Sequence, residues 1–514
     1  MRLGSPFLVA TSLVLAPALS WRSVLVAQTA SAYVPLQDWT MPYVEQLIAA
    51  GVLEDPAPLT RPLRRADLVR ALEAVDTLRL GNAATATVRR LRAALRDDER
   101  APYVRIAGGV GAAAANYARR DPLSAIDSTG PRRSGVGHGT VNADLDFEVA
   151  TSHLVAVTHP QIDTRLKYDP DWFGKQDRAI AGRTAEAYVS AQWKLVEVFF
   201  GRLDRNWGPA GIQGLLLSDD PYGLDHLAFS FGSAKLRLET IATQLDDRRD
   251  TSGVVHRYMS QHRLLFRPAR WSFALWEGSV LSGTDRSFET WYLNPLNAGI
   301  LEQWNNGGNV NSFVGLDFER RGAVTPFGQL MLDDIQVDRS NAGDKKPISY
   351  GLTIGAKGGI GGGATSWQLY YTRVTNLTYR NEDSLQVPLY HSLGTGRNFD
   401  DYDQATLTLG VLPRDGLLLS PEITYLRQGE GDPRLPHPPV SAYPTTPTIF
   451  SGVVERTVRI ALAGRYAVGG RIDLTFNAGV HRISNFEHQS GDTRTRFLGG
   501  ITVNYRFQHE SGLP

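Results

Sequence analysis

The stretch TVRIALAGRY, Thr457 to Tyr466, alternates apolar and polar side chains with a period of two residues. Val458, Ile460 and Leu462 fall on one face of an extended strand, and Arg459 falls on the other. A soluble β-sandwich would bury the apolar face, whereas a membrane barrel would turn it towards lipid. The stretch therefore predicts an amphipathic β-strand, and the surrounding sequence decides between the two architectures.

The same alternation recurs along most of the chain after Tyr103. Further examples are RIDLTFNAGVH (471–481), FLGGITVNYRF (497–507), KLRLETIATQL (235–245), WSFALWEG (271–278), PFGQLMLDDIQV (326–337) and WQLYYTRV (367–374). Many of the segments are about 10 residues or longer, as a tilted membrane strand requires. Aromatic residues stand at segment ends, as in interfacial girdles: Trp271, Trp367, Tyr466, Tyr505 and Phe507.

These features predict a mostly β protein, a large antiparallel transmembrane barrel over residues 101–507 with a C-terminal tail at 508–514. Roughly four hundred residues, at ~20 to 25 per strand and connection, give about 16 to 18 strands. VGGR, Val468 to Arg471, predicts a short turn, and the proline-rich stretch Gln428 to Val454 predicts a long loop. Alternating short and long connections also favour a barrel.

Composition excludes several classes of protein. The chain has 514 residues, a net charge of +1, 42% hydrophobic and 21% charged residues, which argues against a disordered chain and against nucleic acid as a partner. It contains no cysteine, so it forms no disulfide and no thiolate site.

The N-terminus predicts export. Arg2 precedes the apolar run Pro6 to Ser20, and small residues follow up to Ala32, which is typical of a secretory signal peptide over residues 1–32 with cleavage after Ala32 or slightly earlier. The alternative, a membrane anchor, is disfavoured because the run is short for a spanning helix and contains Pro17.

Residues 33–100 predict a small bundle of three amphipathic helices. They begin near Thr40, after Pro62 and near Asn82. The segment resembles part of an S-layer homology module, through Trp39, Leu47, Gly51-Val52-Leu53 and Arg61 to Leu72. That resemblance implies docking to cell-wall polymer, and a purely structural helical bundle explains the same residues.

No catalytic signature is present. The sequence lacks a Gly-x-Ser-x-Gly elbow, a His-Glu-x-x-His motif and a phosphate loop, and GGIGGG at 358–363 is not followed by a helical pattern. Asp333 and Asp334 are adjacent, so on a strand they face opposite sides and cannot act as a pair. We therefore expect no enzyme activity, no catalytic residues, no metal and no cofactor.

Charged and amide side chains on the strand segments are the remaining chemical signal. They allow two interpretations: ion pairs that solvate one another in a barrel lumen, or a carbohydrate site in which Arg and carboxylate groups bind hydroxyls and Trp207 stacks on a sugar. In NWGPAG, Trp207 is expected at the membrane interface, with Gly208 and Pro209 ending the strand. The candidate ligand-binding residues are Arg202, Asp204, Arg205, Trp207, Glu277, Asn294, Asp333 and Asp334.

An ordered set of blocks resembles the Wzi family of capsule-assembly outer-membrane proteins. The blocks are GRLDRNWGPAGIQGLLLSDDP (201–221), QHRLLFRP (261–268), WEGSVLSG (276–283), WYLNPLNAG (291–299) and FGQLMLDDIQVD (327–338). The resemblance implies a large barrel in the bacterial outer membrane, a periplasmic helical bundle at the N-terminus and no enzymatic activity. It also implies lectin-like attachment of capsular polysaccharide to the cell surface.

Two main hypotheses follow. The first is an outer-membrane barrel that anchors surface polysaccharide and contacts outer-membrane lipid and lipopolysaccharide; it predicts a plugged or crowded lumen. The second is a porin or oligosaccharide channel, which needs one inward-folded loop and an open lumen.

Overall fold

The computed structural model describes residues 30–96, 102–117, 137–169, 171–219, 221–251, 253–306, 308–335 and 345–512. Residues 1–29, which hold nearly all of the expected signal peptide, lie outside these ranges. Among the described residues, no helix is long and apolar enough to cross a membrane.

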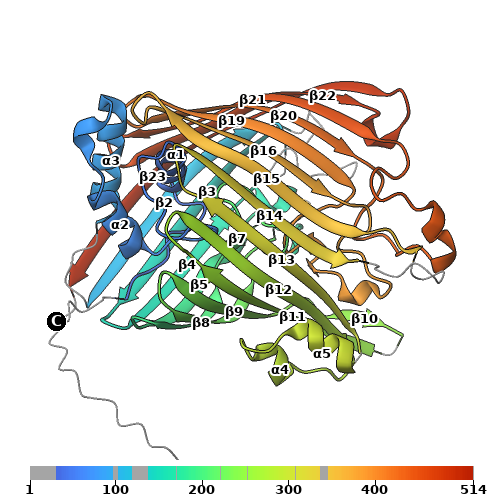
Figure 1. The fold of residues 1–514 in the computed structure, drawn as a ribbon. Helices are drawn as coiled ribbons and strands as arrows, with labels where there is room; N and C mark the ends of the chain where they lie inside the picture. Colours follow the sequence, from blue (N-terminus) through green and yellow to red (C-terminus); the bar gives the residue numbers. More distant parts are fainter. Residues whose placement is uncertain are drawn as a thin grey trace, which may run out of the picture.

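Within these ranges, eighteen antiparallel strands form a closed barrel (Figure 1). Closure comes from β2, which pairs with β3 on one side and with the last strand, β23, on the other. The barrel strands are β2 (Tyr103–Ala115), β3 (His138–Ala150), β4 (Leu154–Asp163), β5 (Ala181–Gln192), β6 (Val196–Arg202), β8 (Asp225–Gly232), β9 (Leu236–Gln244), β11 (Gly253–Phe266), β12 (Trp271–Gly283), β13 (Val310–Arg320), β14 (Val324–Asp334), β15 (Ser349–Ile360), β16 (Thr365–Val374), β19 (Tyr402–Arg414), β20 (Leu417–Gln428), β21 (Glu455–Val468), β22 (Ile472–Ser484) and β23 (Thr493–Gly512).

The burial pattern of β21 shows which way the amphipathic strands face. Val458 and Ile460 are 42% and 61% exposed, whereas Thr457 and Arg459 are only 1% and 9% exposed. The apolar side chains therefore point outwards and the polar ones into the lumen. This arrangement is the reverse of a soluble sandwich and matches a barrel in lipid, so the predicted architecture is confirmed.

The two ends of the barrel differ in their connections. At one end, which we call the short-turn end, strands are joined by short turns such as 469–471 between β21 and β22. At the opposite, long-loop end lie the connections 284–309, 375–401 and 429–454. The expected short turn at 468–471 and the expected long loop at 428–454 thus lie at opposite ends. In an antiparallel barrel, consecutive connections alternate between the two ends. Trp271, Tyr505 and Phe507 are partly exposed near the short-turn end, as interfacial aromatics are.

The last strand is longer than the sequence predicted. β23 does not stop at Phe507 but runs to Gly512, where it pairs with Tyr103 at the start of β2. The boundary was misplaced because residues 508–512 are mainly polar and carry no apolar stripe. Backbone pairing with β2, a partner some four hundred positions away, is what extends the strand.

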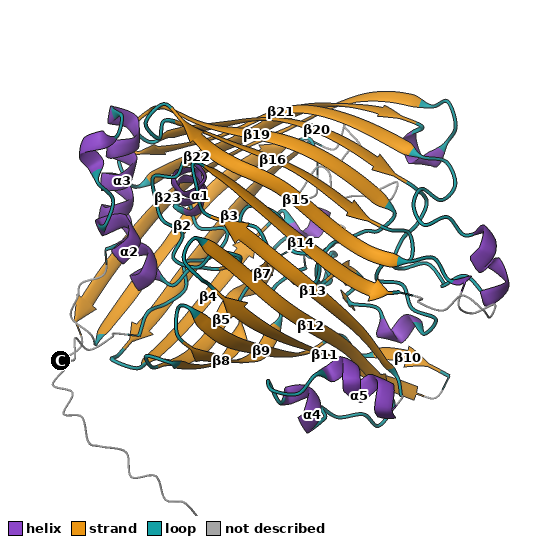
Figure 2. Ribbon diagram, in the orientation of Figure 1, coloured by secondary structure: helices purple, strands orange, loops and turns teal. Residues whose placement is uncertain are grey.

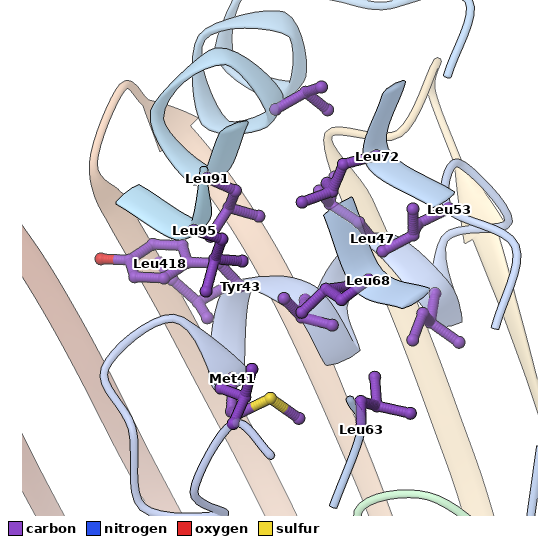
Figure 3. Packing of buried hydrophobic residues seen from close by; sticks show 14 of the residues in the cluster. Met41, Tyr43, Leu47, Leu53, Leu63, Leu68, Leu72, Leu91, Leu95 and Leu418 are labelled. Carbon is purple, nitrogen blue, oxygen red and sulfur yellow. The ribbon is translucent and has the colours of Figure 1, made fainter. Parts of the chain in front are cut away.

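Three helices cover the short-turn end: α1 (Met41–Ala49), α2 (Arg65–Glu73) and α3 (Asn82–Leu95), and Figure 2 shows α2 and α3 grouped there. Their apolar stripes form one core together with side chains of the barrel (Figure 3). The core includes Met41, Tyr43, Leu47, Leu53, Leu63, Leu68, Leu72, Leu91 and Leu95 of the N-terminal region, and Leu412, Leu418 and Ala467 of the barrel.

Hydrogen bonds and ion pairs fix this bundle to the barrel. The Tyr43 hydroxyl donates to the Gly416 carbonyl at 2.8 Å, and the Gln46 amide donates to the Gly410 carbonyl at 3.0 Å. Arg65 donates two bonds, of 2.9 and 2.7 Å, to the buried carboxylate of Glu148 on β3. Such paired charge-assisted bonds hold orientation well, so the bundle and the barrel form one body.

The residues expected at the end of the signal peptide lie against the barrel wall. Ala30 and Ala32 are buried. Ser31 donates its N–H to Gln192 Oε1 at 3.0 Å, and Gln192 Nε2 donates back to the Ser31 carbonyl at 3.0 Å. The Ala32 carbonyl accepts from the Arg65 N–H at 2.9 Å. These residues therefore act as part of the folded protein.

The connection between β6 and β8 folds into the lumen, and we call residues 203–224 the plug loop. Its short strand β7 (Asn206–Trp207) pairs with β1 (Thr60–Arg61) from the linker between α1 and α2. Leu215 is fully buried. Its N–H donates to Gln329 Oε1 on β14 at 2.8 Å. The plug loop thus meets the N-terminal region inside the barrel.

Candidate functional site

Trp207 lies inside the barrel, only 5% exposed, so its expected position at the membrane interface is wrong. The guanidinium of Arg263, from β11, lies 5.0 Å from its ring centroid and also donates to the Leu59 carbonyl at 2.7 Å. Gly208 and Pro209 do end the short strand, but the chain then turns inwards because the apolar residues that follow are buried in the lumen. Trp207 joins the plug loop to the wall.

The other predicted residues of this stretch lie near the start of the plug loop. Arg202 forms an ion pair with Asp225 of β8. Asp204 lies beside Arg202. Side-chain atoms of both residues approach Gly223 so closely that a Cβ added there would lie 3.0 Å from each. Arg205 donates to His226 Nε2 at 2.8 Å, and its guanidinium carbon lies 4.6 Å from the Phe199 ring centroid.

Glu277 and Asn294 belong to a different part of the barrel. Glu277 lies 2.9 Å from His262 Nδ1 and accepts the Gly299 N–H at 2.7 Å, at the start of α5 (Gly299–Asn306). A carboxylate at a helix N-terminus is electrostatically favourable, so Glu277 secures the 284–309 loop. Asn294 follows α4 (Thr290–Leu293), and its side chain accepts the Leu296 N–H at 3.1 Å.

Asp333 and Asp334 lie where the register between β14 and β15 shifts. Asp333 accepts the Tyr379 N–H at 2.8 Å, and Asp334 pairs with Lys346 at 2.7 Å. The eight predicted residues therefore do not converge on one surface. Most of them tie loops to the barrel wall, and only Arg202 borders the surface that we describe next.

An aromatic cluster at the long-loop end combines three loops that are distant in sequence. We call Trp172, Phe173, Tyr222, Tyr390 and His391 the aromatic platform. The Phe173 ring stacks on His391 with centroids 4.1 Å apart, and lies edge-on to Tyr222 and Tyr390, both at 5.9 Å. Phe173 is 43% exposed. The platform therefore offers an aromatic surface at the long-loop end, away from the strands.

A strained hairpin holds one side of the platform. β17 (Leu389–Tyr390) and β18 (Leu393–Gly394) pair through a two-residue turn, His391 and Ser392, with φ values of 48° and 68°. Turns of this kind favour Asn and Gly at both positions, and each non-glycine residue there costs of order 1 kcal/mol or more. The surrounding loops therefore hold His391 in place at a cost in stability.

Polar groups border the platform. The Tyr222 hydroxyl donates to Asp169 Oδ2 at 2.6 Å, and Asp246 accepts the His391 N–H at 2.9 Å. Burial lowers the pKa of His391 below its usual value, with Asp246 partly opposing the shift. Burial raises the pKa of Tyr390, while nearby Arg202 lowers it. At neutral pH the platform thus presents a neutral imidazole at His391 and a neutral phenol at Tyr390 beside paired charges.

Within the described ranges, no group of three or more His, Asp or Glu side chains could hold a metal ion. The aromatic platform is a set of aromatic rings with hydrogen-bonding groups around them. The platform could not be predicted from the sequence, because Trp172-Phe173 and Tyr390-His391 are more than two hundred residues apart.

No protein-family model and no curated protein matches this sequence. Among solved structures it is similar to Wzi, an Escherichia coli outer-membrane protein involved in group 1 capsule assembly and a carbohydrate-binding β-barrel. The TM-score is 0.63 at 13% identity, over 94% of this chain and 100% of that one. The Pseudomonas aeruginosa outer-membrane proteins OpdK and OprD match at TM-scores of 0.44 and 0.43, with 12% and 8% identity, over 79% of this chain and 99% and 95% of theirs.

The likeness to Wzi concerns the fold. Together with the closed barrel and its apolar outer surface, it places this chain in the bacterial outer membrane. Identity of 13% leaves the biochemical role to be argued from the residues themselves.

Proposed function

We propose that this protein is a non-catalytic, lectin-like outer-membrane barrel that attaches capsular or other surface polysaccharide to the cell surface. The observation that carries the proposal is the aromatic platform at the long-loop end. A pyranose ring presents a face of C–H groups that packs on an aromatic ring, while its hydroxyls bind neighbouring polar groups. Phe173 offers such a ring, and Arg202, Asp225 and Asp246 offer such groups.

The arrangement of the lumen supports attachment over transport through a wide channel. The plug loop occupies the lumen beside β12 to β16, and the N-terminal bundle covers the short-turn end. In outer-membrane barrels, short turns face the periplasm and long loops face the exterior. On this orientation the bundle is periplasmic and the platform is external, where a capsule would be held.

The N-terminal helices have a structural role in this proposal. Their apolar side is buried against the barrel, and Trp39 is covered by the guanidinium of Arg506, 4.1 Å from a ring centroid. The residues that resemble a cell-wall module are thus used in docking to the barrel, which supports a structural role at the periplasmic end over binding of cell-wall polymer.

Binding to polysaccharide tests the proposal. The probe is capsular polysaccharide extracted from the producing strain and immobilised on a sensor. We expect the wild-type protein to bind it, and Phe173→Ala to bind at least about fivefold more weakly, since aromatic stacking contributes roughly 1 kcal/mol or more. Phe497→Ala is the matched control, because Phe497 is 56% exposed on the lipid side of β23. Equal binding by Phe173→Ala and wild type would contradict the assignment.

A further inference from the structure

Among the described residues, the plug loop contacts the inner wall from β5, where Gly223 lies close to the Ala185 carbonyl, round to β16. Leu216 packs against Gly278 of β12, and Leu215 against Gly351 of β15. Gln329 of β14 and Gln368 of β16 bond to the backbone of the loop. The contact strands β12, β14, β15 and β16 lie around β13. β2 lies on the opposite side, halfway round the barrel from β13. The lumen beside β2 is therefore not filled by the plug loop.

From Ala107 onward the inner face of β2 is made of very small residues. Val110 is 56% exposed on the lipid side, so the alternate positions face the lumen, and over this part of the strand these are Ala107, Gly109, Gly111, Ala113 and Ala115. At Gly111 the side chains of Asn142 and Asn504 lie against the strand. Two cavities lie along it, with volumes of about 1130 and 410 Å³.

The two cavities adjoin one another and together cover the height of the barrel. Gln37, Arg465 and Thr475 line both of them. The larger cavity reaches the short turn 469–471 and helix α3, and the smaller reaches Tyr117 and His138, next to the long-loop end of β2 and β3. The two cavities therefore adjoin at these shared residues.

The lining of the two cavities is hydrophilic. Midway along it, Asp144, His159 and Arg465 stand among hydroxyl and amide side chains. These hydroxyl and amide side chains are Thr140, Asn142, Gln161, Ser420, Thr475, Asn477, Thr502 and Asn504. Several buried polar atoms there have no hydrogen-bond partner among the described residues, including Asp473 Oδ1, Asn477 Oδ1, Arg465 Nη1 and Arg506 Nη2. Buried polar groups need partners, and in a polar cavity water or solute hydroxyls supply them.

We propose that the two cavities form one narrow polar passage that lets small uncharged polyhydroxylated solutes, of the size of glycerol, cross the barrel beside the plug loop. Hydroxyl and amide groups exchange hydrogen bonds with such solutes as they do with water. At the short-turn mouth, positively charged arginines stand beside negatively charged carboxylates. Their opposite charges largely cancel, so the passage has no strong electrostatic potential that would select an ion.

Swelling of proteoliposomes in isotonic glycerol tests the passage. The wild-type protein is expected to raise the swelling rate above that of protein-free liposomes. Ala113→Trp, which places an indole in the passage, is expected to abolish that increase. Val110→Trp adds the same group to the lipid face of the same strand and is expected to swell like the wild type. Equal swelling by wild-type and protein-free liposomes, or by Ala113→Trp and wild type, overturns the proposal.

Cysteine labelling gives a second measurement that is independent of a bulky substitution. The chain has no native cysteine, so a single introduced thiol reports one position. We expect Ala113→Cys in folded protein to react with a small hydrophilic methanethiosulfonate and lose its glycerol flux. Ala274→Cys is the matched control, because Ala274 is fully buried on the inner face of β12 and should not react. An unreactive Ala113→Cys overturns the proposal.

Discussion

Gln329→Met should release the plug loop without disturbing the barrel. Gln329 is 2% exposed. Its Oε1 accepts the Leu215 N–H at 2.8 Å, and its Nε2 donates to the Trp207 carbonyl at 3.0 Å. Methionine fills a similar volume but bonds to neither group. Each buried backbone group left unpaired costs about 1–3 kcal/mol, so docking of the loop should weaken by about 2–6 kcal/mol.

Hydrogen exchange followed by mass spectrometry measures this loss on the peptide that covers residues 206–218. A loss of about 2 kcal/mol corresponds to roughly thirtyfold faster exchange through local opening. Gln368→Met, which removes one bond of 3.1 Å to the Ala210 carbonyl, should give a smaller increase. Gln508→Met on β23 is the control, since Gln508 bonds to Arg105 and not to the loop. Unchanged protection in Gln329→Met would refute the reasoning.

Three further predictions follow from the fold. Ile460→Lys places a charge on the lipid face of β21 and should lower the unfolding free energy in vesicles by about 2–4 kcal/mol, whereas a loss below 1 kcal/mol would contradict the orientation of the strand. Asp400 is fully buried in the 375–401 connection, and burial raises its pKa well above the usual value. The folded protein therefore keeps a proton on Asp400 that the unfolded chain releases, so the unfolding free energy falls as pH rises above about 4. Asp400→Asn should therefore raise the melting temperature at pH 7 and have no effect below about pH 4, and an equal effect at both pH values would contradict the burial argument. Sequencing of the mature protein should find its N-terminus at or before Ala30, because Ser31 and Ala32 are bonded into the barrel wall; a start at Tyr33 would contradict this.

The barrel could be predicted from sequence because the signals for its strands and turns lie in neighbouring residues. In β21 the polarity of each side chain indicates which face of the strand it occupies, and a glycine pair at 469–470 indicates the turn. The lumen could not be predicted, because its contacts join distant residues. Leu215 is apolar in any context, and it lies inside because of contacts with Gln329 and Gly351, both more than a hundred residues away. For the same reason, Trp207 was assigned to the lipid interface.

The aromatic platform could not be predicted for the same reason. Phe173 and His391 stack only because the barrel brings two loops to the same end, and the spacing of residues within either loop gives no sign of that contact. The resemblance of several blocks to the Wzi family led to the correct fold. Most of the candidate residues in those blocks, however, attach loops to the wall, as Glu277 does for α5.

The pairing of β2 with β23 imposes an order on biogenesis. The seam joins Tyr103 to Gly512, so an incomplete chain is an open sheet with two unpaired edges, a form prone to pairing with other chains. The edge of β2 that pairs with β23 must be protected until the twenty residues of β23 arrive. Because the Trp39 ring is covered by Arg506 of that same strand, the N-terminal helices complete their docking only after the seam has closed. A chain truncated before β23 would therefore lack both the strand that closes the barrel and the Arg506 side chain that covers Trp39.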